Sequence, residues 1–112
     1  MVPHCVIEHS SNIDGNSLTS RVFSGAMDSK LFEENGSDIK VRAISFSNYQ
    51  TGNDKASFVH VALKLLSGRN SEQKLNFSTL FLEHLKTLGL SGCSITVEVI
   101  DIDRNSYSKV LM

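Results

Sequence analysis

The residue with the clearest chemical potential is Pro3, the single proline of this 112-residue chain. It precedes the apolar run Cys5-Val6-Ile7, whose β-branched residues favour extended structure. A proline is acceptable as the first residue of a strand, because no ladder donor is needed there. A proline at a chain terminus, by contrast, carries a secondary amine that can act as a general base. The local sequence leaves both interpretations open.

The histidines and cysteines do not predict a metal site. The chain has four histidines, His4, His9, His60 and His84, and two cysteines, Cys5 and Cys93. Neither set shows the short spacing that brings metal ligands together on a helix or in a loop. We interpret both cysteines as free, mostly buried thiols that pack as small apolar side chains.

Composition and charge exclude several classes of protein. With 40% hydrophobic and 21% charged residues, the chain should fold, and its length predicts one domain spanning residues 1–112. A net charge of −1 gives no electrostatic footprint for nucleic acid. No segment approaches the roughly 18 apolar residues of a membrane helix. The first residues lack the pattern of a signal peptide, so we expect a cytoplasmic protein.

Four segments have the composition and periodicity of strands. They are residues 3–9, 39–46, 57–65 and 94–102. The last of these alternates apolar and polar residues, which is typical of a half-buried strand. The third is largely apolar on both faces, which predicts a central strand covered on each side. A short additional strand is expected over 108–112.

Two segments between these strands predict helices. Apolar residues recur every four positions from Ser17 to Glu34, forming one broad stripe. Asn16 or Ser17 is suited to cap this helix and Gly36 to end it. The second helix begins after Asn70, which starts a capping-box pattern.

The order of these elements is β-α-β followed by β-α-β, in halves of about 3–50 and 55–104. Two strands joined through a helix should pair in parallel with a right-handed crossover. We therefore predict an α+β fold, a four-stranded sheet with both helices on one face. The other face lacks a cover of its own, and oligomerisation is the simplest way to supply one.

Three stretches together carry a resemblance to a known family. They are PHCVIEHSSNI at residues 3–13, FVHVALKLLSGR at 58–69 and the helix that follows. The chain resembles the 5-carboxymethyl-2-hydroxymuconate Δ-isomerases of the tautomerase superfamily, which includes 4-oxalocrotonate tautomerase and macrophage migration inhibitory factor. The resemblance covers nearly the whole chain. It implies a tautomerase-like fold and a homotrimer whose three sheets form a central barrel with the helices outside.

The resemblance also implies an activity, a cofactor-free 1,3-proton shift. The substrate would be an unsaturated 2-hydroxy or 2-oxo di- or tricarboxylic acid, such as 5-carboxymethyl-2-hydroxymuconate in aromatic acid catabolism. Pro3 would be the catalytic base. Arg69 falls on a substrate-binding arginine of the family, and Lys40 replaces another. Arg42 lies two residues farther along the same strand and could partly substitute for that arginine. Lysine lacks the planar fork of a guanidinium.

The chain departs from the family pattern at Val2, since family members begin Met-Pro. An acylated prolyl nitrogen is an amide without useful basicity. We expect the natural chain to begin at Pro3; an extra processing step or a loss of activity are the alternatives. A second hypothesis is a non-catalytic trimer of the same fold that acts as a binding or interaction protein. His4 and Glu8 belong to the matched opening, and we interpret both as structural or supporting residues.

Overall fold

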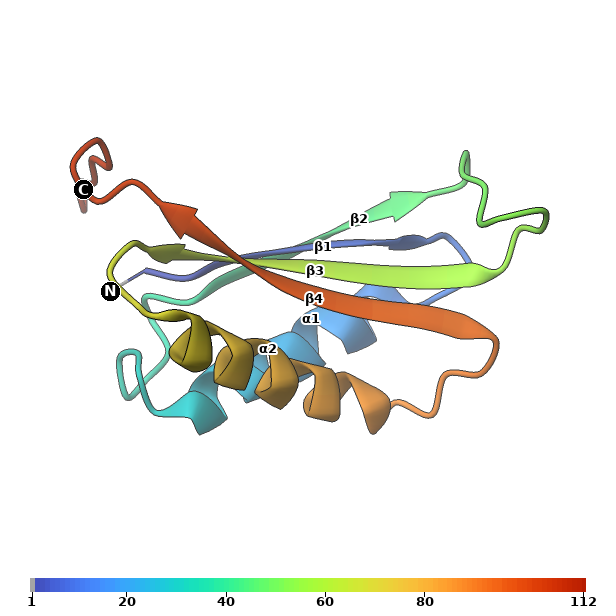
Figure 1. Ribbon diagram of the computed structural model, residues 1–112, viewed down its shortest axis with the longest axis horizontal. Coiled ribbons are helices and arrows are strands. Elements are labelled where there is room, and N and C mark those ends of the chain that lie inside the picture. The colour runs from blue at the N-terminus through green and yellow to red at the C-terminus, as the bar shows by residue number, and fades with distance from the viewer. Residues whose placement is uncertain (1) are drawn as a thin grey trace.

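The computed structural model describes residues 2–112 and contains one mixed sheet with two helices. The elements in chain order are β1 (His4–Ser10), α1 (Gly15–Ser29), β2 (Lys40–Phe46), β3 (Ser57–Leu66), α2 (Ser71–Lys86) and β4 (Cys93–Ile102). The strand order is β2-β1-β3-β4. Strands β1 and β2 are parallel, as are β3 and β4, and the two pairs meet where β1 runs antiparallel to β3. Both helices cover the same face (Figure 1). The predicted α+β fold is confirmed.

The first helix begins earlier than the sequence predicted. Asp14 is its N-cap, and the carboxylate accepts a hydrogen bond from the backbone N–H of Asn16 at 3.2 Å. The hydroxyl of Ser17 donates to the second carboxylate oxygen at 2.8 Å. Asn16 and Ser17 were expected to cap the helix, but both instead donate hydrogen bonds to the carboxylate of the preceding Asp14.

The same helix also ends earlier than predicted, at Ser29 rather than near Gly36. Lys30 takes up the left-handed conformation with φ 58° and donates its backbone N–H to the carbonyl of Met27. Gly36 has φ +73°, but it lies in the connection to β2. A Cβ atom at this position would lie 2.6 Å from the ring of Phe23. The glycine therefore serves a turn packed against α1 and not the helix end.

The predicted capping box of the second helix is confirmed. The side chain of Asn70 accepts from the backbone N–H of Gln73 at 2.8 Å, and the Gln73 side chain accepts from the backbone N–H of Asn70 at 2.9 Å. These two reciprocal bonds satisfy donors at the helix start that would otherwise lack partners.

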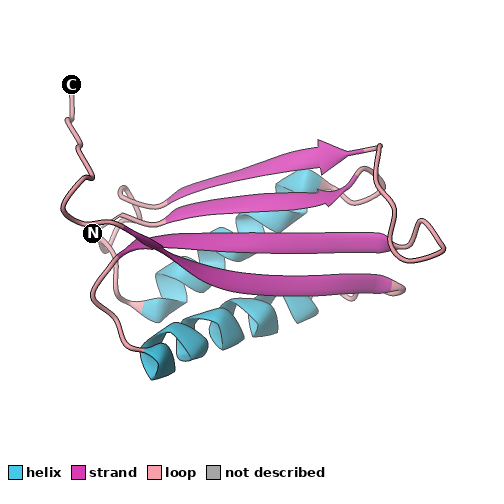
Figure 2. Ribbon diagram, turned by 45° about the horizontal axis from the view of Figure 1, so that its top comes forward, coloured by secondary structure: helices cyan, strands magenta, loops and turns pink. Residues whose placement is uncertain are grey.

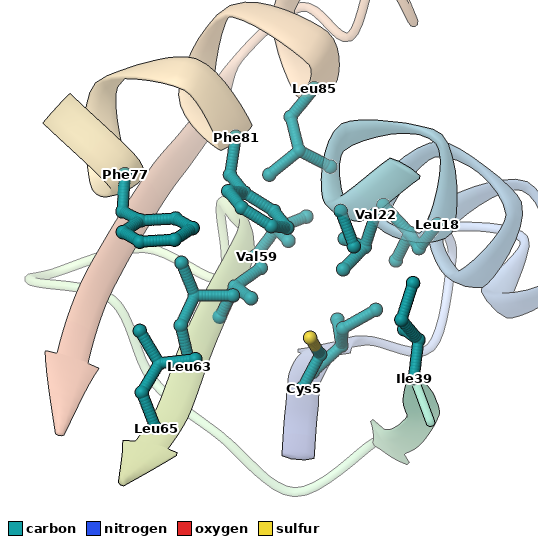
Figure 3. Packing of buried hydrophobic residues seen from close by; sticks show 13 residues of the cluster. Cys5, Leu18, Val22, Ile39, Val59, Leu63, Leu65, Phe77, Phe81 and Leu85 are labelled. Carbon is teal, nitrogen blue, oxygen red and sulfur yellow. The ribbon is translucent and has the colours of Figure 1, made fainter. Parts of the chain in front are cut away.

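The hydrophobic core lies between the sheet and the two helices. Figure 3 shows Phe81 and Leu85 of α2 and Val22 of α1 directed toward Val59, Leu63 and Cys5 of the sheet. Burying each large apolar side chain of this kind contributes about 1.5–3 kcal/mol to folding. Cys5 is fully buried and Cys93 only partly, and both are free thiols. The two cysteines therefore differ in exposure, contrary to the expectation that both are mostly buried.

Within residues 2–112, no helix covers the opposite face of the sheet. Side chains that alternate with the core positions point to this uncovered face, which includes His60 of β3. Its Nε2 pairs with the carboxylate of Glu98, and its Nδ1 lies 2.7 Å from the hydroxyl of Thr96. Lys64 also belongs to this side of β3. The prediction that β3 is a central strand is confirmed, and its outer side alternates apolar Phe58, Ala62 and Leu66 with polar His60 and Lys64.

The chain after β4 forms no further strand. A turn over residues 103–106 redirects it, with the backbone N–H of Ser106 donating to the carbonyl of Asp103 at 3.2 Å. Residues 107–112 have no regular structure. Tyr107 is held instead by His4, whose Nε2 lies 3.0 Å from the tyrosine hydroxyl. The strand expected over 108–112 was therefore a wrong prediction, since these residues do not pair with the sheet and the segment is attached to it through the side chain of Tyr107.

Candidate active site

Pro3 lies directly before β1. Its side chain is almost fully buried, and Val2 before it is only 4% exposed. The carbonyl of Pro3 accepts a hydrogen bond from the backbone N–H of Lys40 at 3.2 Å, which extends the β1–β2 pairing by one step. The prolyl nitrogen needs no ladder partner, as expected for the first position of a strand. Because Val2 acylates this nitrogen, its lone pair is part of a peptide bond.

Lys40 and Arg42 lie on β2, next to the N-terminal end of β1. Lys40 is paired with His4 and Arg42 with Val6. Two residues apart on a strand, both cations share the uncovered face of the sheet. The Arg42 Nη1 lies 3.2 Å from Nδ1 of His4, so the guanidinium extends back toward Pro3. The Lys40 ammonium donates to the carbonyl of Asp38 at 3.3 Å.

Arg69 lies in the connection between β3 and α2, on the helix side of the sheet. Its Nη1 donates to the carbonyl of Leu66 at 3.3 Å, and its guanidinium carbon lies 5.4 Å from the ring centroid of Phe77. Burial lowers the pKa of Arg69, and so does nearby Arg104, while Asp101 opposes the shift. The group stays cationic at neutral pH.

Arg69 also lines a groove of about 310 Å³. The other lining residues are Ser29, Leu31, Gln73, Asn76, Phe77 and Leu80. This groove combines one guanidinium with two amides and an apolar wall, a surface suited to a carboxylate attached to a carbon chain. Pro3, Lys40 and Arg42 do not line it.

All four predicted site residues nevertheless lie at one end of the sheet. His4 is paired with Lys64 of β3, and β3 ends two residues later at Leu66, just before the Arg69 connection. The N-terminus and the connection from β3 to α2 lie at this same end in both views (Figures 1 and 2). The structure brings the four residues to one end of the molecule but does not join them in one pocket.

Further cations at this end were missed from the sequence. The pKa of the His4 imidazole is lowered mostly by burial and further by four nearby cations. These are the predicted Arg42 and Lys40 and two cations that were not predicted from the sequence, Lys64 and Lys109. Arg104 donates from Nε and Nη2 to the carbonyl of Ser67, at 3.1 and 3.0 Å, beside Arg69. Lys64 lies within the matched stretch FVHVALKLLSGR, and its position on the outer side of β3 could have indicated its place.

Six of the eleven lysines and arginines therefore lie toward the end of the sheet where β1 begins, four of them around His4 and two at the connection after β3. They are Lys40, Arg42, Lys64, Arg69, Arg104 and Lys109. A concentration of one charge sign attracts substrates of the opposite sign and stabilises negative charge that develops during a reaction. This arrangement is suited to bind a compound with several carboxylates and to stabilise an enolate oxygen. We refer to these six residues as the cationic cluster.

Comparisons with known proteins agree on fold and family. A family model described as 5-carboxymethyl-2-hydroxymuconate isomerase matches residues 3–108. No curated protein matches the sequence. Among solved structures, a 5-carboxymethyl-2-hydroxymuconate isomerase from Deinococcus radiodurans R1 superposes with a TM-score of 0.77 at 19% identity, covering 96% of this chain and 88% of that chain.

Two further structures share the fold. A 5-carboxymethyl-2-hydroxymuconate delta-isomerase has a TM-score of 0.68 at 14% identity, over 99% of this chain and 89% of that one. A protein described as a fused 4-OT wild type symmetric trimer has a TM-score of 0.75 at 14% identity, over 95% and 90%. At these identities the likeness shows the fold alone. Within residues 2–112, neither helix is long and apolar enough to cross a membrane.

Proposed function

The chain belongs to the 5-carboxymethyl-2-hydroxymuconate isomerase family, and we propose that it catalyses a keto–enol tautomerisation. The proposed substrate is an unsaturated 2-hydroxy or 2-oxo di- or tricarboxylic acid, such as 5-carboxymethyl-2-hydroxymuconate, formed in the breakdown of aromatic acids. The observation that carries the proposal is the cationic cluster around the start of β1, where Pro3 lies. A substrate with several carboxylates matches that concentration of charge.

The proposed base is the nitrogen of Pro3 in a form of the chain that begins at this residue. An α-amino group has an ordinary pKa of about 8. Lys40, Arg42 and the other cations of the cluster disfavour a further positive charge and lower that pKa toward neutrality. The amine takes the proton of the substrate 2-hydroxyl group, or of the carbon next to the 2-oxo group, and returns a proton two atoms away. The shift is redox-neutral, so it requires no electron carrier.

Arg69, Arg42 and Lys40 have the complementary role of binding carboxylates and stabilising the dienolate. A guanidinium binds a carboxylate through two parallel N–H donors, and its charge offsets the negative charge on the enolate oxygen. Lys40 supplies a point charge without this fork. We therefore assign the two guanidiniums, Arg42 and Arg69, to the carboxylates and Lys40 to general attraction.

Assembly into a homotrimer belongs to the same proposal. No helix within residues 2–112 covers the outer face of the sheet (Figure 1), and closed cyclic symmetry would bury that face between identical copies. Two of the structures that share the fold are described as symmetric trimers. Light scattering should give a mass of about 37 kDa, three times the 12.3 kDa of one chain. A stable monomer at micromolar concentration would contradict the trimer.

A second candidate function is a non-catalytic trimer that binds a partner or a small carboxylate. The observation that favours this function is that Val2 is buried and acylates the prolyl nitrogen in the chain that begins Met-Val-Pro. The two functions are separated by comparing chains that begin Met-Pro-His and Met-Val-Pro-His.

The experiment requires the mature terminus of each version to be established by mass spectrometry before kinetics. The loss of dienol absorbance is then followed after mixing with 2-hydroxymuconate. We expect turnover by the chain whose terminus is Pro3 and little or none by the chain that retains Val2. Equal rates would exclude Pro3 as the base. Inactivity of both versions on di- and tricarboxylate dienols would favour the binding function.

A further inference from the structure

The imidazole of His4 uses both of its nitrogens, and the partners define its protonation. Nδ1 lies 3.2 Å from Nη1 of Arg42, and Nε2 lies 3.0 Å from the hydroxyl of Tyr107. A guanidinium can only donate hydrogen bonds, so Nδ1 must be the acceptor and carry no proton. Nε2 therefore carries the single ring proton and donates it to the tyrosine oxygen. This is a neutral imidazole in one defined tautomer.

The surroundings of His4 favour this neutral form. Partial burial lowers the pKa of the imidazole, and so does each of the four neighbouring cations Arg42, Lys40, Lys64 and Lys109. A proton added to Nδ1 would also face the N–H of Arg42, replacing a hydrogen bond with the repulsion of two donors. The neutral ring is thus maintained by contact geometry and by charge together.

We propose that His4 is a positioning residue that orients the Arg42 guanidinium toward a substrate carboxylate, and that Tyr107 fixes the His4 ring. The inference rests on the proposed function and deepens it. Arg42 has five N–H donors, and the single contact to His4 leaves most of them for a bidentate carboxylate. Because Lys40 cannot provide a planar fork, an oriented Arg42 supplies the fork on this face of the sheet.

The arrangement has an energetic reason. Arg42 is an exposed side chain on β2, an edge strand of the sheet, and a free arginine loses rotamer entropy when it is fixed. A contact that fixes the guanidinium before the substrate arrives removes part of that cost from binding. Tyr107 contributes a second constraint, since its ring packs edge-on to the His4 ring with centroids 6.2 Å apart. The C-terminal segment thereby becomes part of the site.

Substitutions at His4 separate its two contacts. In chains beginning at Pro3, His4→Asn keeps an acceptor near the position of Nδ1 but does not reach Tyr107, and His4→Phe removes both contacts. We expect His4→Phe to raise KM about tenfold, the loss of one charge-assisted hydrogen bond, with kcat changed less than about twofold. His4→Asn should recover most of that loss. Tyr107→Phe, in the irregular C-terminal segment, should raise KM by less than His4→Phe.

A double-mutant cycle tests whether His4 acts through Arg42. In an Arg42→Ala background, His4→Phe should have no further effect on KM, because the group that it positions is gone. An equal rise in KM in both backgrounds would overturn the proposal. So would a His4→Asn variant as impaired as His4→Phe.

Two measurements keep this test separate from the isomerase proposal. The ¹⁵N NMR spectrum of the His4 ring should show the neutral Nε2–H form at pH 7, and the ring should titrate below the ordinary histidine pKa of about 6.5. A protonated Nδ1 at pH 7 would overturn the inference. If the chain beginning at Pro3 proves inactive, calorimetric binding of cis,cis-muconate replaces KM. Weaker binding by His4→Phe but not by His4→Asn would support the positioning role while the isomerase proposal fails.

Discussion

Replacing Arg69 by alanine tests whether the groove beside α2 belongs to the active site. The side chain contributes to folding through a hydrogen bond to the Leu66 carbonyl and through its position over the Phe77 ring. Each of these contacts typically contributes about 0.5–1 kcal/mol for a partly exposed group. The variant should therefore fold, with a modest loss of stability that a urea titration can measure.

The expected effect on catalysis is larger than this effect on folding. Losing a charge-assisted hydrogen bond to a carboxylate costs about 1.5–3 kcal/mol, which corresponds to about a ten- to 150-fold fall in kcat/KM. Arg69→Lys keeps the charge but loses the fork, so its kcat/KM should lie between those of the alanine variant and the parent. The assay is turnover of a 2-hydroxymuconate-type dienol by chains that begin at Pro3.

Arg21→Ala provides the matched control. Arg21 is an arginine of α1 whose Nη1 donates to the Thr87 hydroxyl at 2.8 Å, at the far end of α2 from Arg69. It loses a charge and a hydrogen bond of similar kind without touching the cationic cluster, so kcat/KM should stay near the parent value. If Arg69→Ala and Arg21→Ala have the same kcat/KM, Arg69 is not part of the substrate site.

Four further predictions concern the fold. Gly89→Ala should cost about 1–2 kcal/mol of unfolding free energy, since its φ is +66° and a Cβ there meets nothing within 4 Å. Gly36→Ala should cost about 1 kcal/mol more than Gly89→Ala, because the ends of the Phe23 and Met27 side chains must also shift. Equal losses of unfolding free energy in urea would contradict the close approach of position 36 to these side chains. Burial raises the pKa of the Cys5 thiol to about 12. At pH 8 a thiol reagent should therefore label only Cys93 in the native protein, and Cys5 should react only after unfolding. The Cys5 thiol has a pKa of about 9 in the unfolded chain and about 12 in the folded protein, so Cys5 lowers the free energy of unfolding as pH rises from 9 to 12. Fast labelling of Cys5 in the native protein would refute its burial.

The sequence predicted those parts of the fold that depend on local patterns. Alternation in β4 placed one face of that strand on the core, and the Asn70–Gln73 pair located the start of α2. The order of two β-α-β units then determined which strands run parallel. These signals lie within a few residues of each other, so no knowledge of the tertiary structure was needed.

Other features depended on contacts between distant residues. The end of α1 was misplaced because a glycine after an apolar stripe suggests a helix stop, while Gly36 in fact allows the chain to approach Phe23. The expected last strand does not form, and the C-terminal segment instead contacts the sheet through Tyr107 and His4, which lies 103 positions earlier. Neither contact leaves a periodic trace in the sequence.

The candidate site was predictable only where a matched motif supplied the residues. Pro3 and Arg69 lie in matched stretches, and Lys40 and Arg42 were named because the family places an arginine in this region. Arg104 and Lys109 lie in a tail without any recognisable pattern. They join the others because β4 returns the chain to the end of the sheet where β1 begins, and the C-terminal segment continues there (Figure 1).

The division of the cationic cluster between two surfaces bears on how the proposed substrate would be bound. Arg69 packs on Phe77 of α2, on the helix side, while Arg42 extends along the uncovered face of the sheet. The uncovered face is also the one that the proposed trimer would bury. Arg42 would therefore face a neighbouring copy, and the carboxylate that it binds would lie between subunits. Under this proposal, the positions of His4 and Tyr107 couple the orientation of Arg42 to the closing of that interface.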